Sequence, residues 1–249
     1  MSALVASELL KIRTTRSFWG YVAAIALLTG VGAAAHIGST QEAARHEQSF
    51  QLGLVDIVGV AVVIAIILGI TIVTNEFRHG TITPTFLVEP RRERVLGAKS
   101  IAGVAFALAF AVLAFVVIAA VAIPWLAIID IPLRLGEGDV WTRIAEQLLS
   151  VVLWTLLGIA IGTVVQNQVA ALVGTLIWIF LGETLLAGLF SLLDVDGWAA
   201  YLPFHALDAA DGTGGENLLS YWPGVLVSLG WIALLGAAGT WRTLRRDIT

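Results

Sequence analysis

The chain has 249 residues, of which 58% are hydrophobic and only 13% charged, and its mean hydropathy is +0.91. Because soluble domains are about a quarter charged, this composition excludes an ordinary soluble globular protein. The formal net charge is -4, and the lack of Cys excludes disulfides, thiolate metal sites and Cys nucleophiles. Apolar stretches of about 20 residues or more, which can cross the hydrocarbon core as helices, indicate an all-α integral membrane protein.

The N-terminal segment, residues 2–16, has the pattern of an amphipathic helix. Val5, Leu9 and Ile12 recur at helical spacing, whereas Glu8, Lys11 and Thr15 line another face. We therefore expect a helix that lies in the membrane interface before the first span.

Six apolar stretches are long enough to span the bilayer, and we expect them to form one transmembrane domain over residues 1–249. They cover about residues 18–37, 52–74, 100–126, 143–165, 169–190 and 221–241. The first stretch could instead be a signal peptide cleaved near Ala33–Ala35. Its apolar run exceeds the roughly 7 to 15 residues typical of signal peptides, so we favour a span.

The loop between the second and third spans reads EFRHGTITPTFLVEPRRERVLGAK, from Glu76 to Lys99. Gly80 interrupts the preceding helix, Thr83 and Pro84 have the pattern of an N-cap and first helical residue, and Pro90 can open the next helix. A solvated loop would explain the basic residues at its end. It explains less well why Phe77 and Phe86 stay apolar in a loop that faces water. The break and the capping pattern predict a short helix that lies across the cytoplasmic mouth.

Basic residues predict the orientation. If both termini are cytoplasmic, eleven of the fourteen Lys and Arg residues lie inside and three outside. Positive charge concentrates in cytoplasmic loops, so the split predicts a multi-pass plasma-membrane protein with both termini inside. The twelve-to-two preference for Arg over Lys suggests a GC-rich bacterial genome. We expect the basic residues at the end of the N-terminal segment to face anionic headgroups. The residues expected to act as cytoplasmic charges or anchors are Lys11, Arg13, Arg16, Arg91, Arg92, Arg94 and Lys99.

The string SELLKIRTTRSFW, the loop from Glu76 to Lys99, six spans and the outer segment YLPFHALDA together resemble permease subunits of bacterial type-2 ATP-binding-cassette (ABC) exporters. The resemblance covers nearly the whole chain, and the loop is its most specific part. It implies an interfacial helix, a cytoplasmic coupling helix that docks into a separate ATPase subunit, and short outer helices at about residues 186–220. The coupling residues would be Glu76, Phe77, Arg78, His79, Gly80, Thr81 and Phe86.

The same resemblance implies the partners. A separate ATPase would use ATP and Mg, and a second copy of the permease or a sister permease would complete the transporter, surrounded by membrane lipids. The substrate, hydrophobic or amphipathic, would pass outward between the two permeases. Nothing in the pattern points to nucleic acid.

The chain is not expected to be an enzyme or to bind a cofactor itself. Its soluble segments are too short for an ATPase domain. The nearest string to a phosphate loop, Gly97–Ser100, lacks the required glycines. An ATPase-independent channel subunit, immunity factor or scaffold remains the alternative function.

Three motif-like strings are incomplete. Gly136–Asp139 spells the GxGD string of intramembrane aspartyl proteases, but it lies in an outer loop. His46–Phe50 lacks the second His of a zinc-binding HExxH motif. Asp194–Gly197 has too few of the ligands of a calcium loop. We therefore expect no metal site and disfavour an intramembrane enzyme.

Two features within the spans have both a structural and a functional interpretation. Glu183 is an intramembrane carboxylate, which is functional by default because its burial is costly, or else it caps a turn after the fifth span. Gly158 and Gly162 form a GxxxG string that lets helices approach closely. We expect that string to pack within one subunit, with a dimer contact as the lesser alternative.

Overall fold

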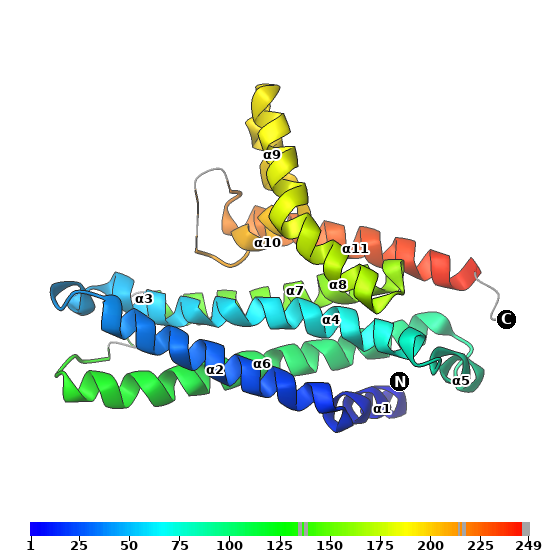
Figure 1. Ribbon diagram of the computed structural model, residues 1–249, viewed down its shortest axis with the longest axis horizontal. Helices are drawn as coiled ribbons and strands as arrows, with labels where there is room; N and C mark the ends of the chain where they lie inside the picture. Colours follow the sequence, from blue (N-terminus) through cyan, green and yellow to red (C-terminus); the bar gives the residue numbers. More distant parts are fainter. Residues whose placement is uncertain (134–135, 137–138, 214, 216–217, 246–249) are drawn as a thin grey trace.

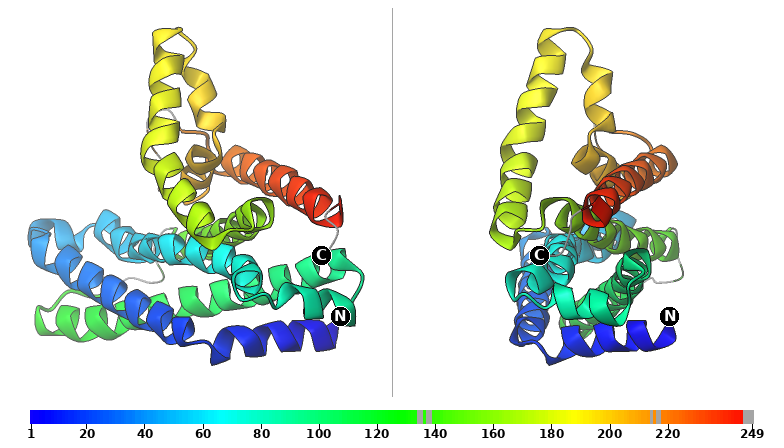
Figure 2. Two further views of the ribbon diagram at one scale, coloured as in Figure 1. Left: turned by 45° about the vertical axis from the view of Figure 1, so that its right-hand side comes forward. Right: turned by 90° about the vertical axis from the view of Figure 1, so that its right-hand side faces the viewer.

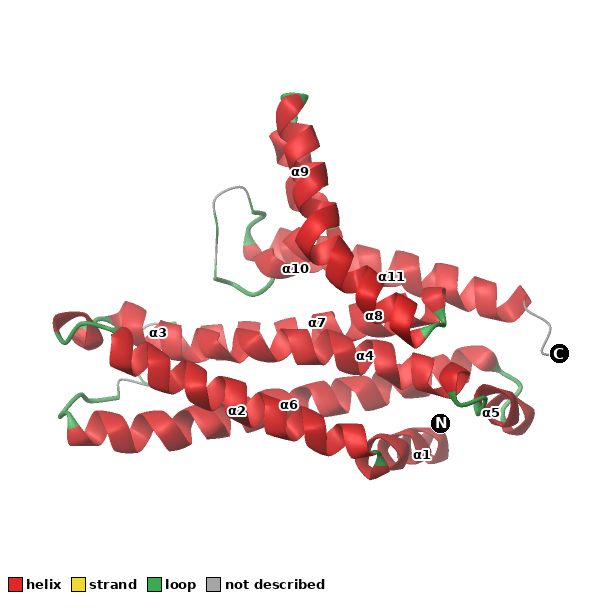
Figure 3. Cartoon of the chain, viewed as in Figure 1, coloured by secondary structure: helices red, strands yellow, loops and turns green. Residues whose placement is uncertain are grey.

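The computed structural model describes residues 1–133, 136, 139–213, 215 and 218–245, and every regular element in them is a helix (Figure 3). In chain order these are α1 (Ser2–Thr14), α2 (Arg16–Ser39), η1 (Ala43–His46), α3 (Gln48–Asp56), η2 (Ile57–Gly59), α4 (Val60–Arg78), α5 (Ile82–Val88), α6 (Arg92–Ile128), α7 (Val140–Val165), α8 (Gln168–Ile177), η3 (Trp178–Gly182), α9 (Glu183–Leu192), η4 (Asp196–Tyr201), α10 (Pro203–Ala209) and α11 (Tyr221–Arg245).

Six helical stretches are long and apolar enough to cross a membrane, which confirms the expected all-α membrane fold with six spans. They are Arg16–Ser39, Gln48–Arg78, Arg92–Ile128, Val140–Val165, Gln168–Leu192 and Tyr221–Thr243. The second combines α3, η2 and α4, and the fifth combines α8, the π-helix η3 and α9.

Four long helices, α2, α4, α6 and α7, lie side by side along the longest axis of the molecule (Figures 1 and 2). Within this bundle α7 packs most extensively on α4, and α2 packs on α6. The fifth span tilts away from the bundle, and α9 projects from it before the chain returns through η4 and α10 onto α11 (Figure 1). The centre of the fold is therefore the α4–α7 pair.

Glycines bring α4 and α7 into backbone contact. A Cβ atom on Gly69 would lie 2.2 Å from the carbonyl oxygen of Thr155, and one on Gly158 would lie 2.4 Å from that of Ile66. Gly162 follows one turn later, 3.0 Å from the Ile70 oxygen by the same measure. The GxxxG string of α7 thus packs against α4 of the same chain.

One end of the bundle, here called the α5 end, gathers α1, α5, the start of α6 and the last turns of α11, whereas α3 and the start of α7 lie at the other end, the α3 end (Figure 1). Between α4 and α5 the chain reverses at Gly80, whose φ is +67°. The Thr81 N–H donates to the Glu76 carbonyl at 2.9 Å and the Gly80 N–H to that of Phe77 at 3.4 Å, which is a Schellman closure.

The predicted start of the short helix at Thr83–Pro84 is wrong by two residues. The helix α5 begins at Ile82 with Thr81 at its N-cap, and Pro84 lies in its first turn. Pro is tolerated there because the first N–H groups of a helix have no intrahelical partner. Pro90 lies just before α6, whose N-cap is Arg91.

Candidate functional site: an ion cluster at the α5 end

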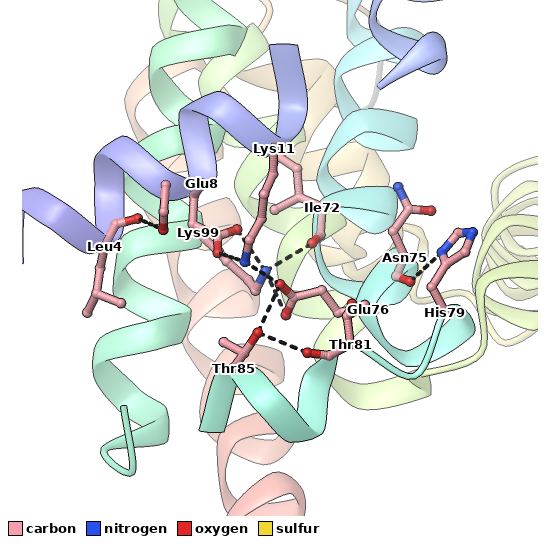
Figure 4. Close-up of polar contacts among 11 residues, drawn as sticks. Leu4, Glu8, Lys11, Ile72, Asn75, Glu76, His79, Thr81, Thr85 and Lys99 are labelled. Carbon is pink, nitrogen blue, oxygen red and sulfur yellow. Dashed lines mark hydrogen bonds and ion pairs between the residues drawn. The ribbon is translucent and has the colours of Figure 1, made fainter. Parts of the chain in front are cut away.

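Four charged side chains meet at the α5 end (Figure 4), and we call Glu8, Lys11, Glu76 and Lys99 the ion cluster. The Nζ atom of Lys11 lies 2.6 Å from Glu8 Oε1 and 2.7 Å from Glu76 Oε1. The Nζ atom of Lys99 lies 2.8 Å from Glu8 Oε2 and 3.0 Å from Glu76 Oε2. Two ammonium groups and two carboxylates thus alternate, and their formal charges cancel.

Three helices supply these charges, and a fourth contacts them. Glu8 and Lys11 are three residues apart on α1, Glu76 is in the last turns of α4, and Lys99 is near the start of α6. Thr85 of α5 lies with its Oγ1 3.5 Å from Glu76 Oε1. The cluster therefore ties the N-terminal helix to two of the long helices, and Thr85, whose hydroxyl donates to the Thr81 carbonyl at 3.0 Å, places α5 at its edge.

Most of the ion cluster is out of solvent. Lys99 is 1% exposed, Glu8 4% and Glu76 6%, whereas the Lys11 side chain is 46% exposed. Burial would lower the pKa of Lys11, but its hydrogen bonds to Glu76 and Glu8 outweigh burial and raise it. Buried charges are tolerated only when they are paired, so α1 and α4 must keep this arrangement for the charges to remain compensated.

A cavity of about 510 Å³ opens beside the ion cluster. The four charged residues form one side of it. Leu68 and Ile72 of α4 and Tyr21 of α2 also line it, together with polar residues that include Ser17, Thr71 and Asn75. The Tyr21 hydroxyl lies 3.0 Å from Thr71 Oγ1.

The predicted coupling residues divide into a buried and an exposed group. Phe86 is buried, with the Arg92 guanidinium 5.0 Å from its ring centroid, and Phe77 is half-buried. Arg78, His79, Gly80 and Thr81 are exposed. Arg78 points to α8 rather than α5, since it donates to Gln168 Oε1 at 3.0 Å.

Next to these residues, two apolar side chains of α5 face outward. Leu87 is 78% exposed and Val88 84%. Exposed basic residues flank them at Arg91 and Arg94, of which Arg94 lies 3.9 Å from Glu89. We call Leu87, Val88, Arg91 and Arg94 the α5 surface.

The residues predicted as cytoplasmic anchors differ in their exposure to solvent. Arg13, Arg16, Arg91 and Arg94 are exposed, as an anchor requires. Lys99 is not, because its ammonium lies inside the ion cluster, so its predicted place at the surface is wrong. The half-buried Arg92 donates to the Thr243 carbonyl of α11 in addition to its contact with Phe86.

Glu8 and Thr85 belong to the site but were not predicted to. The sequence pattern places Glu8 on the polar face of α1, yet it is buried on the face that packs. Its position three residues after Val5 and four before Ile12 places it on their side of a helix, and a carboxylate there is an available signal of a buried partner.

Glu183, at the start of α9, accepts hydrogen bonds from the first turns of α10. The N–H of Phe204 lies 2.9 Å from its Oε1 and the N–H of His205 3.1 Å from its Oε2, while His205 Nδ1 lies 2.6 Å from Oε2. The Trp178 indole donates to Oε1 at 3.3 Å. These contacts are those expected of a carboxylate that caps the turn after the fifth span, and they lie away from the ion cluster. A functional role of Glu183 stays a prediction.

A second polar group lies toward the α3 end and was not predicted as a site. Arg143 Nε lies 3.3 Å from Asp56 Oδ1, and Gln147 donates to the Asp211 carbonyl at 3.1 Å. Ser150 donates to the Asp211 carboxylate. Burial raises the pKa of Asp211 to about 7; the Ser150 hydroxyl opposes this shift and the Asp208 carboxylate adds to it.

Among the described residues, no group of three or more His, Cys, Asp or Glu side chains is arranged to hold a metal ion. Of the GxGD string, Glu137 and Gly138 lie outside the described residues, and Asp139 is the N-cap of α7. Two of the basic residues used to predict the orientation, Arg134 and Arg246, also lie outside them.

Comparison with known families shows which family the chain resembles. A family model described as "ABC-2 family transporter protein" matches residues 4–182, more than half of the chain. The matched range contains the ion cluster, the α5 surface and the first four spans. Comparison with curated proteins finds no match.

Proposed function

Because the chain belongs to the ABC-2 family of transporter proteins, we propose that this multi-pass membrane permease works with a separate ATPase subunit to export a hydrophobic or amphipathic substrate. The partner would hydrolyse ATP with Mg, and the permease would supply no catalytic group. A second copy or a sister permease would complete the path through the bacterial plasma membrane.

In this proposal the α5 end faces the cytoplasm. Support comes from the exposed basic residues gathered there, including Arg13, Arg16, Arg78, Arg91 and Arg94, because positive charge is favoured on the cytoplasmic side. The exposed apolar residues Leu87 and Val88 then face water. Apolar side chains rimmed by charge are typical of a protein-binding surface.

The ion cluster is the observation that carries the proposed coupling role. Glu76 joins Thr85 of α5 to the ammonium groups of Lys11 and Lys99, so four helices meet at one carboxylate. The backbone closure from Thr81 to Glu76 and the packing of buried Phe86 against Arg92 also attach α5 to α4 and α6, so in this proposal α5 moves with these long helices. The α5 surface would dock on the ATPase, and its Arg residues would face acidic residues there.

Purification from the native cell in mild detergent tests the proposal. A Walker-motif ATPase should accompany the wild-type chain and be lost from Leu87→Asp and Val88→Asp, which place a charge on the exposed part of α5. Ser7→Asp adds the same charge to the exposed side of α1 and should leave co-purification intact. If no ATPase accompanies the wild type at any detergent strength, the ATPase-independent alternative is favoured.

Gly80 tests coupling separately from docking. A Cβ at Gly80 meets nothing within 4 Å, so Gly80→Ala acts only through the positive φ, at a cost of about 1–2 kcal/mol. We expect Gly80→Ala to retain membrane insertion but to lose most ATP-dependent transport, and Gly80→Asn, which tolerates this conformation, to keep more of it. Equal transport by wild type and both variants would argue against a role for the turn.

A further inference from the structure

The cavity beside the ion cluster has the properties of a small-molecule site. Its volume of about 510 Å³ is in the range of ligand pockets. Glu8, Glu76 and Lys99 line it, and all three are more than nine-tenths buried. Charged groups held out of solvent at the wall of a cavity are pre-oriented for a ligand that reaches them, because they need not be desolvated again.

The charges on the wall restrict the ligand. Two ammonium groups and two carboxylates sum to zero, so a ligand with a net charge would leave one buried charge uncompensated. A ligand that carries both signs can pair with each. The half-exposed Lys11 is the member of the ion cluster able to turn toward an anionic group, which leaves carboxylate oxygens of Glu8 and Glu76 for a cation.

The other walls specify the rest of the ligand. Leu68 and Ile72 are apolar and buried, and Tyr21 adds an aromatic ring. Asn75, one turn before His79, is half-buried and supplies an amide at the same cavity. A molecule with a polar head and an apolar body fits this division.

We propose that the cavity binds the zwitterionic, net-neutral head group of a single-chain amphiphile, with the first part of its chain against Leu68, Ile72 and Tyr21. This inference rests on the proposed function, for which it names a substrate class. Because Glu76 also contacts Thr85 of α5, an amphiphile that takes over part of the ion cluster changes how α5 is held. Binding of the amphiphile would thereby alter the position of the α5 surface.

Binding to the purified chain, without any ATPase, tests the inference. The probe is radiolabelled lysophosphatidylcholine, and the competitors are monoacylglycerol and lysophosphatidate with the same acyl chain. We expect the zwitterion to bind about tenfold more tightly than either competitor. Asn75→Trp, which fills the cavity from a half-buried position, should abolish this preference, whereas Leu27→Trp, on the exposed side of α2, should retain it.

A charge change gives a result that a purely structural role would not. Lys11→Met leaves the wall with a net negative charge, so preference should move from lysophosphatidylcholine to a cetyltrimethylammonium probe. Equal binding of all probes to wild type and to Asn75→Trp would overturn the inference. It would indicate that the amphiphiles partition non-specifically onto the apolar surface of the protein. If the probes bind without selectivity but an ATPase still co-purifies, the inference fails and the proposed function stands. If binding is selective but no ATPase accompanies the chain, the proposed function fails and the cavity remains a binding site.

Discussion

Lys99 is the residue on which the ion cluster depends most. Its ammonium is 1% exposed and contacts both carboxylates, whereas Lys11 is half-exposed and can be replaced in part by water. We expect Lys99→Met to lower the free energy of unfolding by about 3–5 kcal/mol, because it leaves buried negative charge uncompensated. Thermal unfolding in detergent measures the loss.

Two further variants are the controls for Lys99. Lys11→Met should cost less, because its site is open to solvent. Adding Glu76→Gln to Lys99→Met should recover part of the loss, since it removes the unpaired charge. A double variant less stable than Lys99→Met alone would contradict charge compensation as the cause.

Asp211 predicts a pH dependence of stability. Its pKa is about 7 in the folded chain against 3.8 for an unperturbed group, so between these values the folded state retains a proton that the unfolded state has released. Stability should therefore fall as the pH rises from about 4 to about 7 and then level off. Burial also raises the pKa of Asp208 to about 6, which gives a change of the same sign, so Asp211→Asn should reduce this pH dependence and should unfold a few degrees above wild type near pH 8.

The matched control for Asp211 is Asp194→Asn, on the exposed turn after α9. It should reproduce the wild-type curve. A wild-type protein that is more stable near pH 8 than near pH 5 would show that the burial of Asp211 does not govern its stability.

At the scale of elements, the contact between α4 and α7 sets the tightest packing constraint. Gly158→Ala places a methyl group 2.4 Å from the Ile66 carbonyl oxygen, which is backbone and cannot turn away. The two helices must separate, and we expect a loss of about 1–3 kcal/mol in the free energy of unfolding. Gly174→Ala in α8 meets nothing within 4 Å and should be neutral or slightly stabilising. Equal unfolding temperatures for the two variants would refute the close crossing.

The existence of the elements was more predictable than their ends. Six spans follow from hydropathy, which is a local property, and the break at Gly80 follows from its conformational freedom. The start of α5 does not, because Thr81 and Thr83 can both cap a helix. The choice of Thr81 depends on the Schellman closure, in which its N–H is already turned back to Glu76.

The ion cluster was predictable only in part for a related reason. Glu76, Lys11 and Lys99 were recognised individually, but Glu8 and Lys99 are 91 positions apart in the sequence. Only the packing of α1 against α6 brings them together. A positive-inside count treats every Lys as a solvated charge, which is why Lys99 was assigned to the surface.

For the whole molecule, the orientation is the prediction that decides most about function. The chain has no Cys, so single cysteines can be introduced without background. In intact cells, a membrane-impermeant maleimide should label Ser49→Cys near the α3 end, and should label Thr81→Cys at the α5 end only after permeabilisation. Both positions are exposed, so the difference reports sidedness. The opposite pattern would place the α5 surface outside the cell and remove the proposed ATPase contact.

The residues of the ion cluster are synthesised at different times, and this order affects when α1 can dock. Glu8 and Lys11 leave the ribosome first, and Lys99 follows only after the helical hairpin of α2 and α4 has been made. Until then the N-terminal helix carries a carboxylate whose buried partner does not yet exist, so α1 cannot settle into its final place. We therefore expect docking of the first helix to wait for Lys99, and a nascent chain whose Lys99 is still inside the ribosome should leave its N-terminus open to protease while its first two spans are already inserted.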